Sequence, residues 1–508
     1  MRILAAVVCL LLFPGCAQLE GMATRYRAER MVWQAQREET RLKVGKTAPD
    51  SATLLRIRSA YTGLRATFHP PFLQGSGKDV ERLRVDIARQ VGGAELTAAR
   101  AALAANRPEL ALESARWVAS IAEADTGLGR QAGFATAMAL RQFRRYDEAV
   151  ATLRGMLDRY PPIAPPSLDR EDEILGIPDA IIGLRSELGD SVGARKEQGN
   201  AIAYYRGVLA GNPPPMLEAQ VRARISRTLL EMGDANSAYA EVSTLRKLVS
   251  NTPALKSLEA ELLYTEARIR GMQHDYAGAI QRYDSVVKTY PDSPYAARAL
   301  LDGAVISERV NDNAGAIARY RAILDRPHAD PGIAAVASYR MAMVKEQMGN
   351  WAEAKQLLEQ IPLQFPRSRA AIEAPVAIVE HYLRLREPDA AKAALVKSIE
   401  TYRKLIAKDT SSVYGAVYRW NILRAYTALR QWRDALATVN QMAEKDRGAP
   451  IVAEALFEGA QIAQMLKDNA LSERYLQQIL VDYPESPRAA AVRKFLGSTA
   501  RKGGSGQK

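Results

Sequence analysis

Along the chain, a small residue is repeatedly followed four positions later by a bulky one. The pairs are Ala149/Leu153, Ala201/Tyr205, Ala238/Val242, Ala279/Tyr283, Ala316/Tyr320, Ala354/Leu358, Ala391/Leu395 and Ala435/Val439, with Ala111 upstream and Leu471/Tyr475 downstream. Residues four apart share a helix face, so the small one lets a neighbouring helix approach while the bulky one fills the space beside it. From Ala201 to Ala435 successive alanines lie 37–44 residues apart. A period of this size predicts a stacked helical repeat.

A linker of proline and serine supplies a second repeating signal. Segments 290–297, 365–371 and 483–490 each begin with an aromatic residue and proline, and each carries a serine two positions after the proline. Proline cannot continue the preceding helix, and serine is a good N-cap for the next one. We therefore expect one helix to end and another to begin at each linker. Residues 17–46 and Leu54–Thr67 predict a further helix pair near the N-terminus.

These residues resemble the tetratricopeptide repeat. Its sequence pattern is visible as Ala267, Tyr276, Ala279, Tyr283 and Pro291, and again as Ala342, Gly349, Trp351, Ala354, Leu358 and Pro366. The resemblance covers roughly residues 94–497. It implies an all-α fold, a tetratricopeptide-like α-solenoid of stacked antiparallel helix hairpins that form a superhelix.

The N-terminus has the pattern of an export signal. Arg2 precedes an apolar run from Ile3 to Phe13, too short to span a bilayer, and residues 13–16 resemble a bacterial lipobox that ends at Cys16. In such proteins the cysteine is diacylated and becomes the mature N-terminus. An ordinary secretory peptide with an incidental cysteine is the alternative. Because Ala17 and Gln18 follow Cys16, resemblance to lipoprotein sorting signals implies anchoring at the periplasmic face of the outer membrane.

Together the lipobox and the linkers make the chain similar to envelope lipoproteins of the Bam-complex type and to periplasmic proteins of the YbgF type. The expected organisation is a signal peptide at 1–15, an anchor segment with N-terminal hairpins at 16–93, tetratricopeptide-like units at 94–210, a C-terminal array at 211–496 and a disordered tail at 497–508. A proline-rich insertion at 160–178 accounts for the long gap between Ala149 and Ala201.

Charge changes this picture little. The formal net charge is +13 and the pI is near 9.6, which would permit binding to nucleic acid. The basic residues are, however, interspersed with Asp and Glu along helix faces, as on a solvated helix surface. The export signal also argues against a nucleic-acid partner.

No pattern typical of an active site is present. His69, His274, His328 and His381 lie far apart, and none belongs to a metal-binding motif. Residues 75–78 read Gly-Ser-Gly-Lys, but Asp79 stands where a phosphate-binding loop requires Ser or Thr. We therefore predict no enzymatic activity, no catalytic residues, no metal site and no cofactor.

A binding surface is the remaining candidate for function. In tetratricopeptide arrays the first helices of the hairpins line the concave groove. Counting fifteen and eleven residues back from the registered alanines selects the pairs Tyr264/Arg268, Tyr339/Met343 and Trp420/Arg424. Aromatic residues and arginine are enriched at interaction hot spots, although packing between hairpins would also explain these residues.

These residues favour two classes of function. The first is a lipid-anchored periplasmic scaffold that binds protein partners of the cell envelope during envelope assembly or export. The alternative is a binder of peptidoglycan or an exported polysaccharide, through the basic surface and the aromatic residues of the groove.

Overall fold

The computed structural model describes residues 16–43, 51–67, 78–104, 107–122, 126–160, 162, 174–327, 329–408, 413–484 and 486–494. Every regular element in these ranges is a helix, which confirms the all-α fold. The predicted signal peptide, most of the predicted insertion at 160–178 and the tail at 497–508 lie outside the described residues. Cys16 is the first residue of a described helix, but its side chain lies outside the description.

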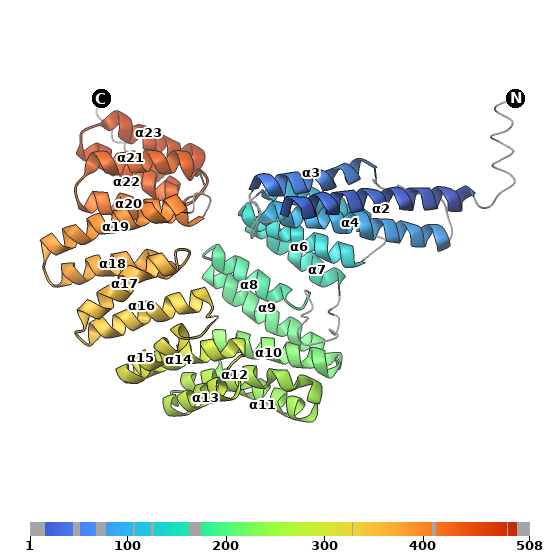
Figure 1. The fold of residues 1–508 in the computed structure, drawn as a ribbon, viewed down its shortest axis with the longest axis horizontal. Coiled ribbons are helices and arrows are strands. Elements are labelled where there is room, and N and C mark those ends of the chain that lie inside the picture. Colours follow the sequence, from blue (N-terminus) through green and yellow to red (C-terminus); the bar gives the residue numbers. More distant parts are fainter. Residues whose placement is uncertain are drawn as a thin grey trace, which may run out of the picture. The chain divides into compact units, whose positions relative to one another are not determined.

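The chain divides into two compact units, Met1–Glu259 and Ala260–Lys508. Figure 1 shows the helices of each unit laid side by side in chain order. The first unit contains α2 (Cys16–Lys43), α3 (Ser51–Thr67), α4 (Lys78–Ala104), α5 (Pro108–Ile121), α6 (Thr126–Gln142), α7 (Tyr146–Arg159), α8 (Ile177–Glu187), α9 (Ser191–Ala210), α10 (Pro215–Glu231), α11 (Ala235–Asn251) and the 3-10 helix η2 (Pro253–Leu258). The domain boundary predicted at 210/211 falls at the end of α9, inside this unit.

The second unit begins within α12 (Glu259–Met272). It continues with α13 (Tyr276–Thr289), α14 (Pro294–Arg309), α15 (Asn313–Leu324), α16 (Pro331–Gln347), α17 (Trp351–Gln364), α18 (Arg369–Arg384), α19 (Pro388–Lys408), α20 (Val413–Ala428), α21 (Trp432–Lys445), α22 (Ile451–Met465) and α23 (Asn469–Asp482), and residues 487–494 are helical. Even-numbered helices are the first helices of hairpins and odd-numbered ones the second. From α13 to α23 each helix packs against the next, as predicted for stacked hairpins.

A left-handed residue closes the first helix of each hairpin from α6/α7 to α22/α23. Its φ lies between 56° and 89° at Arg144, Gly189, Gly233, His274, Asn311, Gly349, Arg386, Arg430 and Lys467. The residue that follows is the N-cap of the second helix, as where the carboxylate of Asp275 accepts a hydrogen bond from the amide of Gly278 at 3.0 Å. Left-handed backbone reverses the chain within three residues, so each hairpin is tight.

The linkers predicted between hairpins are confirmed. Ser293 caps α14, and its hydroxyl accepts a hydrogen bond from the amide of Tyr295 at 3.2 Å. Ser368 accepts from the amide of Ala371 at 3.1 Å, and Ser486 accepts from the amide of Ala489 at 3.1 Å. Each serine satisfies an amide that has no partner within its helix.

The predicted pairs of small and bulky residues form the core of the second unit. Ala279, Ala316 and Ala354 are fully buried, as are the bulky partners at Tyr320 and Leu358. The alanines let the second helix approach the first helices on either side, and the tyrosines and leucine fill the space beside them.

The predicted positions of the small residues are wrong in two hairpins. In most hairpins the small residue lies four positions after the N-cap, as Ala279 does after Asp275. By that rule α9, capped by Asp190, has Ala194 in place of Ala201, and α23, capped by Asp468, has Ser472 in place of Leu471. The predictions differ from the structure because Ala201/Tyr205 and Leu471/Tyr475 have the same spacing of four and lie close to the true positions.

Correcting the register changes the spacing around the insertion. The gap from Ala149 to the corrected small residue, Ala194, is 45 residues, and the next, to Ala238, is 44. The apparent gap of 52 residues therefore arose from counting to Ala201.

Candidate binding face of the first helices

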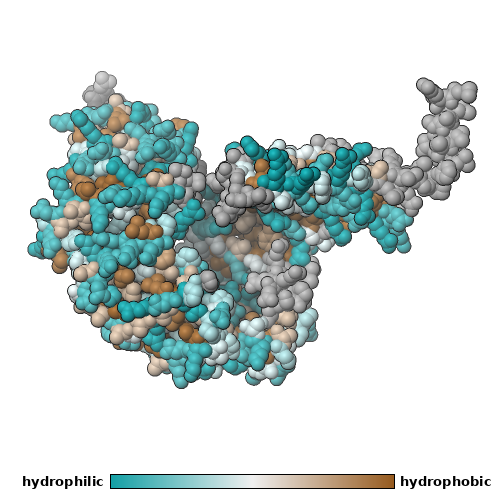
Figure 2. Space-filling view, in the orientation of Figure 1, coloured by the Kyte–Doolittle hydropathy of each residue, from teal (hydrophilic) through white to brown (hydrophobic). Residues whose placement is uncertain are grey.

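In the second unit, first helices of neighbouring hairpins pack against one another. Helix α16 packs against both α14 and α18, and α20 packs against α22. Figure 2 shows small apolar patches separated by hydrophilic residues on the visible surface of this unit. A partner that bound to first helices would contact side chains from several hairpins at once.

The predicted site residues lie on three of these helices. Tyr264 and Arg268 are on α12, and the other two pairs are on α16 and α20. These helices belong to alternate hairpins, with α14 and α18 between them in the chain. The three pairs are therefore separate features of the face and do not form one cluster.

Tyr264 makes the contacts of a packing residue. Its hydroxyl donates a hydrogen bond to Asp302 of α14 at 2.7 Å, and its ring centroid lies 5.8 Å from that of Tyr283 and 5.4 Å from that of Tyr295. Burial, reinforced by Asp302, raises the pKa of Tyr264, so the phenol is neutral and remains a donor. This side chain joins one hairpin to the next, and Arg268 beside it is half-buried.

Tyr339 and Met343 are half-buried against the core that α16 shares with α17 and α18. Burial raises the pKa of Tyr339, and the carboxylates of Glu373 and Glu380 act in the same direction. Each side chain presents only part of its surface to solvent, so this pair supplies a small contact area.

Trp420 lies at a cavity of about 380 Å³, which we call the Trp420 cavity. Its walls come from α20, from α22 and from residues 487–494. The lining residues are Trp420, Thr427, Glu454, Phe457, Glu458, Gln461, Ile462, Met465 and Arg488. Arg424, the predicted partner of Trp420, is exposed and does not line the cavity.

Polar contacts hold one wall of the Trp420 cavity in place. The guanidinium of Arg488 pairs with Glu454 at 2.6 Å and lies 4.5 Å from the ring centroid of Phe457. Stacking of this kind orients both the cation and the ring. The aromatic wall is therefore fixed before a ligand arrives.

One carboxylate of the Trp420 cavity carries an uncompensated charge. Glu458 accepts a hydrogen bond from the hydroxyl of Thr427 at 2.7 Å, and no basic side chain of the described chain forms an ion pair with it. Met465, at the edge of the cavity, is 60% exposed. The cavity thus combines four apolar side chains with two neutral polar ones, the Arg488–Glu454 ion pair and the carboxylate of Glu458.

The sequence prediction missed Phe457 because of the misplaced register in the last hairpin. Counting fifteen residues back from Leu471 gives Leu456, which is fully buried. Counting from Ser472 gives Phe457, the position that Trp420 occupies in the preceding hairpin. The Asp468 cap, which fixes Ser472, is visible in the sequence and could have corrected the count.

The described residues include two of the four histidines, His274 and His381. They contain no group of three or more His, Cys, Asp or Glu side chains placed to hold a metal ion. His381 stacks on Trp351 with ring centroids 3.4 Å apart and contacts Glu346 at 2.6 Å, and His274 contacts Tyr276 at 2.9 Å. No helix among the described residues is long and apolar enough to cross a membrane.

The stacked hairpins and their N-caps define a tetratricopeptide-like array, a class of protein that binds other proteins. Family comparison agrees for two parts of the chain. Residues 250–373 match the tetratricopeptide repeat-like domain, and residues 131–162 match the tetratricopeptide repeat. These segments correspond to α12–α17 and to α6–α7. No curated protein gives a significant match.

The chain is also similar to solved structures of low sequence identity. A tetratricopeptide repeat protein from Parabacteroides merdae is 14% identical, with a TM-score of 0.28 over 55% of this chain and 98% of its own. Yeast Tom70 is 11% identical, with a TM-score of 0.36 over 96% of each chain. PilW, a type IV pilus biogenesis factor, is 14% identical, with a TM-score of 0.26 over 54% of this chain and 97% of its own.

Proposed function

We propose that this chain is a scaffold that binds a protein partner on its first helices, with the Trp420 cavity as the main contact. The observation that carries the proposal is the cavity of about 380 Å³ with aromatic and thioether walls. Trp, Phe and Met are enriched at protein interfaces, and a few anchors in desolvated pockets supply most of the binding energy. An apolar side chain of the partner would contact Trp420, Phe457 and Met465.

The charge of the cavity favours a basic partner segment. A lysine or arginine beside the inserted apolar side chain would pair with Glu458, while Arg488 is already held by Glu454. An anionic envelope polymer would meet the same carboxylate unfavourably. The cavity therefore supports a protein partner over peptidoglycan or an acidic polysaccharide.

Affinity capture from detergent-solubilised membranes tests this proposal with the full chain as bait. We expect Trp420→Ala and Phe457→Ala each to weaken partner binding by about thirtyfold, since a hot-spot truncation costs about 2 kcal/mol. Glu458→Gln should weaken it by about tenfold. Glu473→Gln, which removes an exposed carboxylate from α23 outside the cavity, is the matched control and should bind normally.

Melting curves of the same variants distinguish binding from packing. If Trp420 only packs between hairpins, Trp420→Ala lowers stability by about 3–5 kcal/mol and leaves the affinity of the folded fraction unchanged. That result, together with normal binding by Phe457→Ala, would reject the cavity as a partner site. Adding Arg424→Ala to Trp420→Ala tests whether the exposed arginine of the predicted pair contributes as well.

We propose further that the scaffold is tethered by a lipid on Cys16 at the periplasmic face of the outer membrane, where it serves envelope assembly or export. The support is the lipobox-like tetrad at residues 13–16 followed by Ala17 and Gln18. Intact-mass analysis should show an acyl adduct on the parent, and Cys16→Ser should release the protein from the membrane fraction. A membrane-bound Cys16→Ser variant and an unmodified parent would refute the tether.

A further inference from the structure

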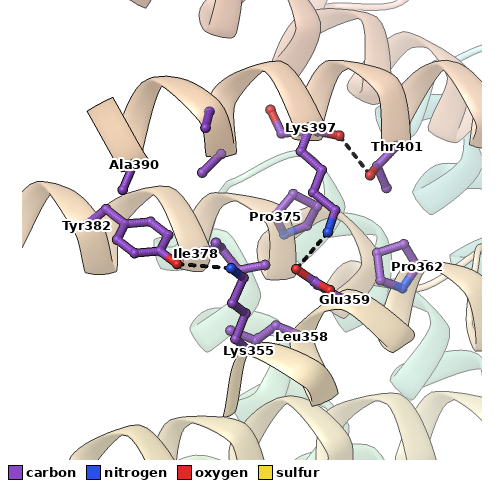
Figure 3. Close-up of a pocket in the computed structure, with 13 residues that line it drawn as sticks. Lys355, Leu358, Glu359, Pro362, Pro375, Ile378, Tyr382, Ala390, Lys397 and Thr401 are labelled. Atoms are coloured by element: carbon purple, nitrogen blue, oxygen red, sulfur yellow. Dashed lines mark hydrogen bonds and ion pairs between the residues drawn. The ribbon is translucent and has the colours of Figure 1, made fainter. Parts of the chain in front are cut away.

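A second cavity, of about 320 Å³, lies between α17, α18 and α19, and we call it the Lys355 cavity. Two of these are second helices, so this cavity belongs to a different surface from the Trp420 cavity. Leu358 and Pro362 of α17 and Pro375 and Ile378 of α18 form its floor, as Figure 3 shows. All four residues are apolar and are buried to more than nine-tenths in the unbound chain.

The sequence of α19 explains why the space is open. This helix presents Ala390, Ala393 and Ala394 to the cavity, and methyl groups are too short to reach the floor. Pro362 and Pro375 lie inside helices. Their rings carry no N–H and add rigid apolar surface to the cavity. An apolar ligand would therefore find a preformed space that the protein itself does not fill.

The charged groups of the cavity come from two helices, Lys355 and Glu359 from α17 and Lys397 from α19. Lys355 donates a hydrogen bond to the hydroxyl of Tyr382 at 3.0 Å, and its ammonium lies 5.5 Å from the centroid of that ring. Lys397 pairs with Glu359 at 2.8 Å. Figure 3 shows both contacts as dashed lines. Two cations thus face one carboxylate.

Lys355 has no ion-pair partner of its own. Within the described residues, no carboxylate lies within ion-pair distance of it. Glu359, which is paired with Lys397, acts on Lys355 only from a greater distance and also raises its pKa. The hydrogen bond to Tyr382 raises the pKa of Lys355, so the amine is charged at neutral pH. The Tyr382 hydroxyl accepts from Lys355 and keeps its own proton free to donate.

We propose that the Lys355 cavity binds an aliphatic carboxylate, such as a free fatty acid. The hydrocarbon chain lies on the proline, leucine and isoleucine floor, and the carboxylate accepts hydrogen bonds from the Lys355 ammonium and the Tyr382 hydroxyl. Charge-assisted hydrogen bonds are among the strongest available, and each buried methylene adds apolar contact. A hydrocarbon with a cationic head group would instead place like charges together.

A peptide fits this cavity less well. Peptide amides need hydrogen-bond partners when they are buried, and the hydroxyls of Ser398 and Thr401 already donate to the carbonyls of Leu395 and Lys397. A fatty acid brings a single polar group, which Lys355 and the Tyr382 hydroxyl beside it can bind. This match of polarity favours the aliphatic carboxylate over a peptide with an apolar C-terminal residue.

Isothermal titration calorimetry of the full chain with decanoate, below its micelle concentration, tests the proposal. We expect saturable binding that Lys355→Met weakens by at least about tenfold, as expected for loss of a hydrogen bond to a charged group. Ala394→Phe should abolish binding by filling the space. Lys392→Met, which removes an exposed lysine of α19 outside the cavity, should bind decanoate like the parent.

Ligand variants complete the test. Decyltrimethylammonium, with the same chain and opposite charge, should bind at least tenfold more weakly than decanoate. Absence of saturable decanoate binding, equal binding of the two amphiphiles, or unchanged affinity in Lys355→Met would overturn the proposal. So would a leucine-terminated peptide that binds in this cavity when decanoate does not. Lys355→Met keeps the cavity walls intact, so its result is decisive even if Ala394→Phe fails to fold.

Discussion

At the scale of single residues, most hairpin turns place a residue with a side chain in the left-handed conformation, which glycine adopts more easily. Six of the nine turns named above place a residue other than glycine in the left-handed region, among them Arg386, Arg430 and Lys467. For an L-residue this conformation costs roughly 1–2 kcal/mol, because the Cβ approaches the following carbonyl. The turns therefore store local strain that the helices on either side maintain.

Replacement of one such residue by glycine should stabilise the chain. Lys467→Gly removes the Cβ at φ 61° and should raise stability by about 0.5–1 kcal/mol, once the greater freedom of glycine in the unfolded chain is counted. Thermal unfolding followed by circular dichroism measures this effect. The converse control is Gly349→Ala, at φ 82° with open space around it, which should lower the melting temperature. A lower melting temperature for Lys467→Gly would contradict the strain argument.

The N-cap of α13, Asp275, makes the stability of the folded chain depend on pH. The hydrogen bond from the Gly278 amide, followed by that from Arg270, lowers the pKa of Asp275. Because the folded-state pKa lies below the unfolded one, the cap stabilises fully above the unfolded pKa, and this stabilisation is lost as pH falls through the folded pKa. We expect Asp275→Ala to melt below the parent at neutral pH, with the difference shrinking in acid. Asp275→Asn, which keeps a neutral cap, should not show that narrowing.

At the scale of elements, close approach of helices depends on the small residues. Ala354 is fully buried where α17 packs between its neighbours, so Ala354→Leu should destabilise the second unit by about 1–3 kcal/mol through overpacking. Ala352→Leu, in the same helix but exposed, is the matched control and should change stability little. Urea unfolding compares the two. Equal stability of both variants would mean that Ala354 does not mark a tight helix contact.

At the scale of the whole molecule, a repeat array responds locally to a local defect. Helices α16 and α17 pack against α14, α15 and α18, and α5–α7 belong to the other compact unit. Because stability in such arrays is a sum of nearest-neighbour terms, Ala354→Leu should speed amide exchange in α16–α18 by roughly tenfold or more and leave α5–α7 unchanged. Hydrogen exchange with mass spectrometry resolves both regions. A uniform increase along the chain would show that the units unfold as one.

The sequence alone determined that the chain is built of paired helices, and it located the helix ends at the three linkers of proline and serine. Ser293 and Ser368 were predicted as caps and Ala279 and Ala354 as buried contacts, because capping and the period of 3.6 depend on residues within a few positions of each other. The lipidation of Cys16 also follows from sequence and remains a prediction.

Only the tertiary structure showed which of the predicted site residues pack between hairpins and which border a cavity. Tyr264 and Trp420 occupy equivalent positions, yet the first is held by Asp302 of the next hairpin and the second borders a cavity with Phe457. The Lys355 cavity likewise arises because the alanines of α19 leave space over the prolines of two other helices. Whether a cavity forms depends on the volumes of side chains from three different helices, and no local pattern in the sequence predicts how well they fill the space between the helices.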